Sequence, residues 1–227
     1  MKLLLSSVQT ARTLLRQHFP PSRLVAASFL SHLKGANIFL KLEGELPTGS
    51  FKPRGALCAL HAKLQRSPIR GVVASSTGNH GAAVAYAAER FGVPAFIFLP
   101  QNSNPVKRAK IAGLGAKIFE EGLDLADAHR AAATFAEAEA LYFLNDATDP
   151  DLPTGPATIA CEVLEALADT GLIYVPMGDT ALIRGLAAAA KQISPKVRIV
   201  GVQAQRAHPT TFPGGKGASL RPKIARQ

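Results

Sequence analysis

Short apolar runs alternate with stretches of helical periodicity from position 37 onward. Runs of strand length lie at 37–42, 71–75, 94–99, 116–120, 141–145, 172–176 and 197–202. Apolar residues recur at helical spacing in 53–65, 79–91, 105–113, 124–140, 155–168 and 181–192. Strands that are apolar on both faces and alternate with helices are typical of a parallel sheet covered on both sides. The pattern therefore predicts an α/β protein.

The two ends of the chain fall outside this alternation. Leu3, Leu14 and Leu15 favour an amphipathic first helix, although the basic segment before the first acid, Glu43, would also suit an organelle transit peptide. No apolar run reaches the roughly 18 residues that a membrane helix needs, and we expect no membrane contact. Residues 209–227 show no apolar periodicity and are predicted to be disordered.

Composition narrows the classes of function. Cys58 and Cys161 lie in helical patterns without metal-ligand spacing, which indicates buried reduced thiols, a cytoplasmic protein and no metal site. The net charge of +10 raises the alternative of a nucleic-acid binder, with basic residues in the tail at Lys216, Arg221, Lys223 and Arg226. Scattered basic residues and an aromatic content of only 6% argue against it, and we expect no nucleic-acid partner.

The loop "TGSFKPRGA" (48–56) places Lys52 between Phe51 and the stiff Pro53 where a helix is predicted to begin. Such a lysine has little conformational freedom, and partial burial would favour the neutral, nucleophilic amine that forms a Schiff base. The alternative is a solvated lysine in a first helical turn.

Two further loops follow predicted strands and open predicted helices. "SSTGNHGAA" (75–83) offers hydroxyl, amide and imidazole groups beside glycines, at a helix N-terminus that favours an anion such as a carboxylate. "PMGDTALIRG" (176–185) could cradle a phosphate on Gly178 and the helix N-terminus. The second loop lacks both the GxxxxGK[ST] and the GxGxxG pattern, which argues against a nucleotide. Each loop alone could also be an ordinary polar helix cap.

Together these loops resemble the pyridoxal-phosphate enzymes of the tryptophan synthase β fold, and most closely the threonine/serine dehydratases. The resemblance runs from about Thr10 to His208 and includes "LKLEGELPTGSFKPRGAL", "SSTGNHGAAVAYAAERFGVPAFIFLP", "KIAGLGAKI", "TGPATIACEVLEAL" and "VPMGD". It implies two open, mostly parallel sheets with helices on both faces. It also implies the cofactor pyridoxal 5'-phosphate and elimination of water from L-threonine or L-serine, giving a 2-oxo acid and ammonia.

The resemblance implies a role for each matched position. Lys52 would hold the cofactor as a Schiff base and then act as a base on the substrate α-hydrogen. Phe51 would pack against the pyridine ring, and Asn79 would bind the ring's 3-hydroxyl oxygen. The substrate carboxylate would be bound by Ser76, Thr77, Gly78, Asn79 and His80. The cofactor phosphate would be held by Gly178, Asp179, Thr180, Ala181 and Leu182.

The family's division into two domains is also implied. The larger, cofactor-binding one would comprise 1–70 and 150–208, and the smaller would comprise 71–149, with the active site between them. The stretch "NDATDPDLPTGP" (145–156), rich in Asp, Pro and Gly, independently suggests a domain junction. Homodimers are usual in the family, so a homodimer is a candidate state.

Several positions depart from the family's pattern. Asp179 stands where dehydratases usually have glycine. Repulsion between its carboxylate and a phosphate charge at ~5 Å would cost roughly 3 kcal/mol before screening, at an effective dielectric near 20. A cation such as Arg184 could offset this cost if it approaches. Ala82 replaces a common glutamine, and Gln203 replaces a glutamate found near a cation site in many relatives. Relatives usually continue well beyond His208, so the larger domain is expected to be incomplete. A truncated, weak or inactive homologue with at most a binding role therefore remains the alternative function.

Overall fold

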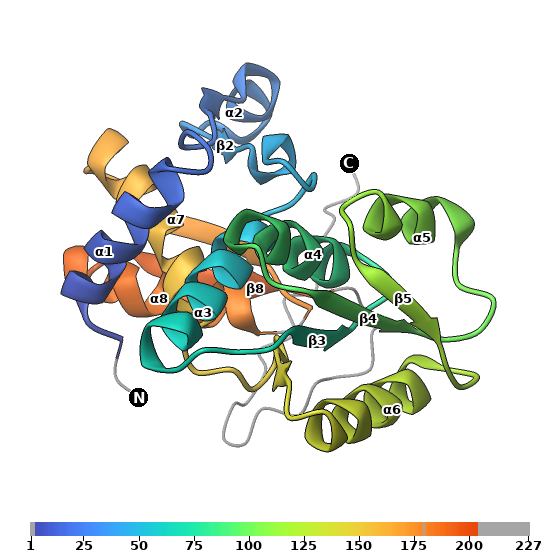
Figure 1. Cartoon of the computed structure of the whole chain (residues 1–227). Coiled ribbons are helices and arrows are strands. Elements are labelled where there is room, and N and C mark those ends of the chain that lie inside the picture. Colours follow the sequence, from blue (N-terminus) through green and yellow to red (C-terminus); the bar gives the residue numbers. More distant parts are fainter. Residues whose placement is uncertain (1–2, 179, 204–227) are drawn as a thin grey trace.

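A four-stranded parallel sheet forms the centre of the computed structural model, which describes residues 3–178 and 180–203 (Figure 1). The strand order is β5 (Lys117–Glu120), β4 (Ala95–Leu99), β3 (Val72–Ser75) and β6 (Tyr142–Phe143). The predicted strands 71–75, 94–99 and 116–120 are confirmed, whereas the run 141–145 contributes only a two-residue edge strand. The inner strands β3 and β4 are the most apolar and the most deeply buried.

Helices cover both faces of this sheet. In Figure 1, α4 (Asn79–Phe91) lies on one side and α6 (Leu125–Ala138) on the other, while α5 (Pro105–Ala112) lies near β5. The buried face of α4 is almost entirely alanine, so this helix lies close to the sheet. The face under α6 is filled by aromatic rings, with Phe98 stacked on Phe119 at 4.8 Å between ring centroids.

A second, two-stranded parallel sheet is formed by β7 (Leu172–Pro176) and β8 (Arg198–Val202). Its cluster of buried side chains joins α7 (Thr154–Ala166) and α8 (Ala181–Ile193) to α1 (Leu5–Arg16), which is the predicted amphipathic first helix. Between the two sheets runs α3 (Lys52–Arg66), whose first half is buried against both α4 and α7. The sequence thus gives the α/β layers that the apolar pattern predicts.

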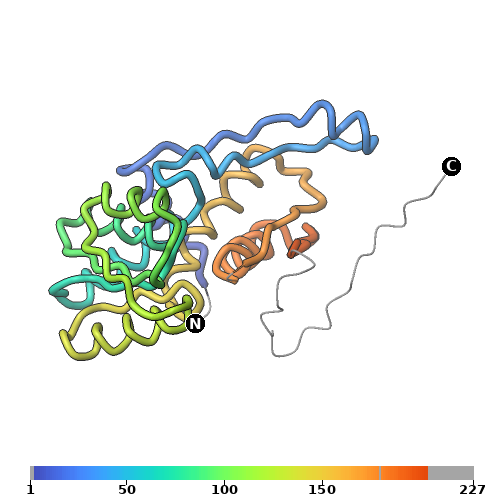
Figure 2. Tube along the Cα trace, turned by 90° about the vertical axis from the view of Figure 1, so that its right-hand side faces the viewer, coloured from blue at the N-terminus to red at the C-terminus, as the bar shows by residue number. Residues whose placement is uncertain are grey.

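The strand predicted at 37–42 is not part of a parallel sheet. Residues Phe39–Lys41 (β2) pair antiparallel with β1 (Leu24–Ala26), and the two strands with α2 (Ser28–Lys34) form an arm that extends along one side of the molecule (Figure 2). Phe39 and Leu40 are 40% and 45% exposed, so their apolar character does not reflect burial between helices. A 3-10 turn, Glu43–Glu45, connects the arm to the rest of the chain.

Both cysteines are free and buried, as predicted. Burial raises the pKa of the Cys58 thiol to about 12, which keeps it protonated and unreactive. Within the described residues, no helix is long and apolar enough to cross a membrane. The predicted disordered tail, 209–227, lies outside the described residues.

Candidate active site

Lys52 is the first residue of α3, and its side chain is only 9% exposed. Pro53 suits the next position because the missing amide hydrogen would have no helical partner there. The Lys52 backbone N–H donates to Ser50 Oγ at 3.4 Å, and the Lys52 amine lies 5.4 Å from the centre of the Phe51 ring. The sequence prediction of a confined lysine at a helix start is therefore matched by the geometry.

Asp146 is a member of the site that sequence reasoning missed. It lies on the loop after β6, and its Oδ2 accepts a hydrogen bond from Lys52 Nζ at 2.8 Å. The same two atoms form an ion pair between α3 and this loop. The available signal was the position of Asp146 at the carboxyl end of a predicted strand, where ligands of parallel sheets collect.

His80 joins this pair from the first turn of α4. Its Nε2 lies 2.9 Å from the carbonyl oxygen of Leu144, which can only accept, so Nε2 carries the proton. The other ring nitrogen, Nδ1, faces Asp146 Oδ2 at 3.9 Å. Lys52 and His80, predicted from separate loops, are thus brought together by one carboxylate.

The charge of Asp146 is set by these neighbours. Burial alone would raise the pKa of its carboxyl group. Attraction to His80 and to Lys52, with the hydrogen bond from Lys52, outweighs burial and holds the pKa below its usual value. Asp146 is therefore an anion at neutral pH inside a mostly buried cluster.

The "SSTGNH" turn leaves the N-terminus of α4 open. Ser76 Oγ accepts from the Gly78 amide at 3.2 Å, and Gly78, the N-cap residue, contributes no side chain. A Cβ added at Gly78 would meet nothing within 4 Å, so there is space beside the turn. Asn79 is exposed, and Thr77 is partly buried. A helix N-terminus of this kind, without a capping side chain at Gly78, is suited to an anion.

The turn before α8 likewise has an N-cap residue without a capping side-chain hydrogen bond. Thr180 is the N-cap residue and makes no capping hydrogen bond through its side chain, and a Cβ added at Gly178 would also meet open space. Ala181 is buried, and Leu182 packs with Phe51 in the same apolar cluster. Asp179, the predicted unfavourable carboxylate, lies outside the described residues.

Arg184, the predicted neighbouring cation, points toward the Asp146 loop. Its Nη2 donates to the carbonyl oxygen of Ala147 at 3.0 Å. Its Nε is buried and makes no hydrogen bond within the described part of the chain. One donor near the start of α8 is thus available to a further acceptor. Ala82, the other noted departure, is buried in the core of α4 and does not line this space.

A second buried cluster fixes the first turn of α3. Arg54 is 1% exposed and forms bidentate ion pairs with Glu43, at 2.8 and 2.9 Å, and with Glu162, at 2.6 and 3.0 Å. Thr158 Oγ1 accepts a further hydrogen bond from Arg54 at 2.8 Å, and Lys41 pairs with Glu162 at 2.6 Å. Two cations and two carboxylates thus compensate one another. This network ties Lys52, two positions earlier, to α7.

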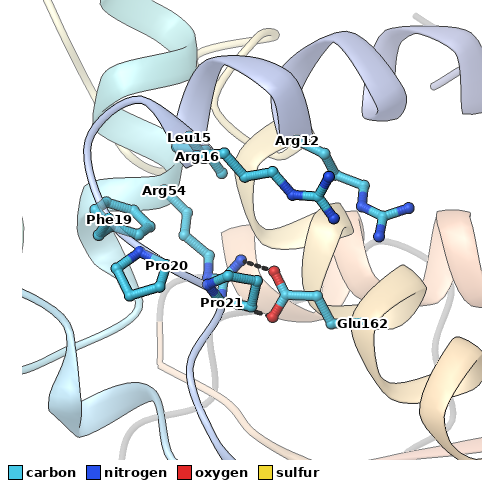
Figure 3. Close-up of a pocket in the computed structure, with 8 residues that line it drawn as sticks. All are labelled: Arg12, Leu15, Arg16, Phe19, Pro20, Pro21, Arg54 and Glu162. Atoms are coloured by element: carbon cyan, nitrogen blue, oxygen red, sulfur yellow. Dashed lines mark hydrogen bonds and ion pairs between the residues drawn. The ribbon is translucent and has the colours of Figure 1, made fainter.

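The pocket drawn in Figure 3 lies beside this network rather than at Lys52. Its walls come from α1 and the proline-containing segment that follows, including Arg12, Phe19 and Pro21. Arg54 and Glu162 close it with their ion pair. Lys52, His80 and Asp146 are absent from its lining, so this pocket is separate from the candidate site.

Comparison with known proteins identifies the family. A family model described as "Pyridoxal-phosphate dependent enzyme" matches residues 15–225. The chain belongs to this family. Its relatives include an L-threonine ammonia-lyase of Thermotoga maritima, 36% identical over 88% of this chain and 50% of that protein. Another, from Geobacter sulfurreducens, is 33% identical over 92% of this chain and 52% of that protein.

Solved structures of pyridoxal-phosphate enzymes share the fold. Threonine deaminase isoform 2 from Solanum lycopersicum superposes with a TM-score of 0.83 at 28% identity, covering 88% of this chain and 55% of that chain. Maize serine racemase gives 0.84 at 27% identity, covering 88% and 61%. The predicted α/β fold of pyridoxal-phosphate enzymes is confirmed. The chain spans about half the length of the curated relatives it matches.

The site fits pyridoxal phosphate, the cofactor of this family. A buried primary amine at Lys52 is the group that an aldehyde requires, and the Phe51 ring beside it offers a flat apolar surface. The N-terminus of α8 suits an anion, and Arg184 Nε, which makes no hydrogen bond within the described residues, provides a donor for a phosphate. Among the described residues, the Asp146 carboxylate already occupies a hydrogen-bonding position on this amine.

Proposed function

We propose that this chain forms the cofactor-binding part of an ammonia-lyase that removes water from L-threonine or L-serine, giving a 2-oxo acid and ammonia. The observation that carries the proposal is the buried Lys52 amine, which shares one carboxylate with His80 of the "SSTGNH" turn. The curated relatives named L-threonine ammonia-lyase support the same reaction. Serine and threonine both carry a β-hydroxyl group and differ by one methyl group, so both are proposed as substrates.

The proposed cofactor contacts come from the starts of three helices, α3, α4 and α8. Pyridoxal phosphate supplies an aldehyde that reacts with an amine and a ring that withdraws electrons from the substrate. Lys52 would provide that amine, and its Nζ would take the α-proton of the substrate. Phe51 would pack against the ring, and Asn79 would donate to the ring's hydroxyl oxygen. The turn 178–182 would hold the phosphate.

The proposed substrate contacts lie at the N-terminus of α4. The turn 76–80 binds the substrate carboxylate at a helix N-terminus whose N-cap residue, Gly78, has no side chain. His80 is held by the Leu144 carbonyl and so presents a fixed ring edge to this space. The site lies between a smaller domain, 71–149, and a larger one, 1–70 with 150–208. This division is supported by the two separate parallel sheets.

The test is cofactor binding followed by turnover. The purified chain with added pyridoxal phosphate is expected to show the visible absorption of a protein-bound Schiff base, which serine changes and which Lys52→Ala removes. Lys63→Ala, on the same helix but outside the site, is the control and should retain the band. Release of a 2-oxo acid from serine or threonine then establishes the lyase. Absence of the band in the unaltered chain would reject the proposal.

A catalytically weak or inactive homologue with a binding role is the second candidate. Tyr174 and Val202 on the smaller sheet are 64% and 50% exposed, so part of that apolar surface is uncovered. A chain of this kind would show the Schiff-base absorption without releasing 2-oxo acid. That combination of results separates the second candidate from the first.

The state and surroundings of the protein are proposed on separate grounds. We propose a homodimer in which the apolar arm residues Phe29 (78% exposed) and Leu33 (60% exposed) are covered by the same patch of a second copy. Sedimentation should then show a dimer that Leu33→Ser weakens.

Two free buried thiols support a cytoplasmic location. We propose no membrane or nucleic-acid partner; salt-sensitive DNA binding lost on deleting 210–227 would contradict the latter.

A further inference from the structure

The Asp146 carboxylate stands where an aldehyde must approach the Lys52 amine. Its Oδ2 lies 2.8 Å from Lys52 Nζ, inside the distance at which a reacting carbon would have to come. Lys52 is 9% exposed and the Asp146 side chain is 26% exposed, so water screens the pair only in part. This contact therefore affects both the charge of the amine and access to it.

The titratable and charged groups around Asp146 come from three elements. Lys52 approaches from α3 and His80 from α4, the latter at 3.9 Å through Nδ1. Arg184 of α8 reaches the same loop by its hydrogen bond to the Ala147 carbonyl oxygen. These contacts hold the loop against Lys52, so the position of the carboxylate is fixed from several sides.

We propose that Asp146 controls the reactivity of Lys52, holding the amine as an ammonium ion so that it condenses with an aldehyde only after the ion pair opens. The proposal deepens the function proposed above and rests on it for the identity of the aldehyde. It adds a positioning residue that the sequence did not indicate. Cofactor loading then becomes a step in which the loop carrying Asp146 releases Lys52.

The chemical balance of this step is simple. The ammonium of Lys52 first loses one proton to water, leaving a neutral amine and an unpaired Asp146 carboxylate. The amine nitrogen then bonds to the aldehyde carbon, and the carbonyl oxygen leaves as water as the carbon–nitrogen double bond forms. Asp146 disfavours the loss of this proton, because the neutral amine no longer forms an ion pair with the carboxylate.

The experiment measures the basicity of Lys52 without its cofactor. The full chain, freed of cofactor, is treated with formaldehyde and cyanoborohydride at a series of pH values, and methylation of Lys52 is followed by mass spectrometry. Only the neutral amine reacts, so the rate reports its protonation. Asp146→Asn should raise the rate at neutral pH about tenfold, because the neutral amide no longer holds Lys52 as an ammonium ion.

Matched controls separate charge from access and from damage to the fold. Asp127→Asn changes the net charge equally on α6, away from the site, and should leave the Lys52 profile unchanged. Lys63 in the same samples serves as an internal standard. Asp146→Glu restores a carboxylate and should return the profile toward that of the unaltered chain. Equal profiles for the unaltered chain and Asp146→Asn, or a rate increase that is uniform at every pH, would overturn the proposal.

A parallel reaction distinguishes this inference from the proposed function. Pyridoxal phosphate with borohydride should label Lys52 irreversibly, and faster in Asp146→Asn than in the unaltered chain. If formaldehyde shows the shift while pyridoxal phosphate does not label Lys52, the control of the amine by Asp146 stands and the proposed cofactor role fails. If pyridoxal phosphate labels both chains while formaldehyde shows no shift, the cofactor role stands and the role of Asp146 fails.

Discussion

Arg54 shows how one buried residue can position a reactive neighbour. Its guanidinium group donates to two carboxylates and a hydroxyl group, while its backbone lies in the first turn of the helix that Lys52 begins. Burial disfavours charge on Glu162, but the hydrogen bonds and charges of Arg54 and Lys41 hold its pKa below the usual value. Glu162 is therefore held as an anion beside Arg54, and the members of this buried network depend on one another.

Removal of Arg54 should be strongly destabilising. Arg54→Met leaves Glu43 and Glu162 without their shared cation, which should lower the free energy of unfolding by about 3–5 kcal/mol. Urea denaturation measures the change. Arg23→Met is the matched control, because Arg23 pairs with Glu45 at the surface and is expected to give little change. A loss for Arg54→Met no larger than that of the control would contradict this account.

The lowered pKa of Asp146 predicts an acid-sensitive contribution to stability. A carboxyl group whose pKa is lower in the folded state stabilises the fold above its unfolded pKa of about 3.9, and this contribution is lost as the pH falls through the folded value. The difference in unfolding free energy between the unaltered chain and Asp146→Asn should therefore shrink as the pH is lowered from neutral to about 3. Urea denaturation at several pH values tests this. A difference that is independent of pH would contradict it.

At the scale of elements, the crossing of α3 and α7 requires glycine. A Cβ added at Gly155 would lie 2.1 Å from the Arg54 carbonyl oxygen and 2.5 Å from the Gly55 nitrogen, both backbone atoms that cannot rotate away. Gly155→Ala should separate the two helices and destabilise the fold by about 1–3 kcal/mol. Thermal unfolding measures the loss. Gly171→Ala, where an added Cβ meets nothing within 4 Å, should leave the melting temperature nearly unchanged.

The sequence predicted most helices and inner strands because their apolar periodicity reflects burial. It did not predict β1 and α2, since α2 has no buried residues and its apolar side chains are exposed. The position of Lys52 at a helix start followed from Pro53 and the preceding turn. Its contact with Asp146 could not be predicted, because the two residues lie 94 positions apart and meet only through the packing of α3 beside the sheet.

At the scale of the whole molecule, the smaller sheet leaves apolar surface uncovered. Tyr174 and Val202 are 64% and 50% exposed on neighbouring strands. We expect this surface to drive association that increases with protein concentration. The double substitution Tyr174→Ser with Val202→Ser should reduce that association in light scattering, whereas Leu33→Ser on the arm should reduce only the proposed dimer. Concentration-independent scattering by the unaltered chain would contradict the expectation.

Lys52 and Asp146 are held by different parts of the molecule. Lys52 begins a helix that is packed on both α4 and α7 and is tied to α7 through Arg54 and Glu162, whereas Asp146 lies on the loop after β6. A displacement of that loop would therefore change the separation between the ammonium and the carboxylate while Lys52 stays fixed in its helix. The ion pair thus converts a movement of one loop into a change in the chemistry of a single nitrogen atom.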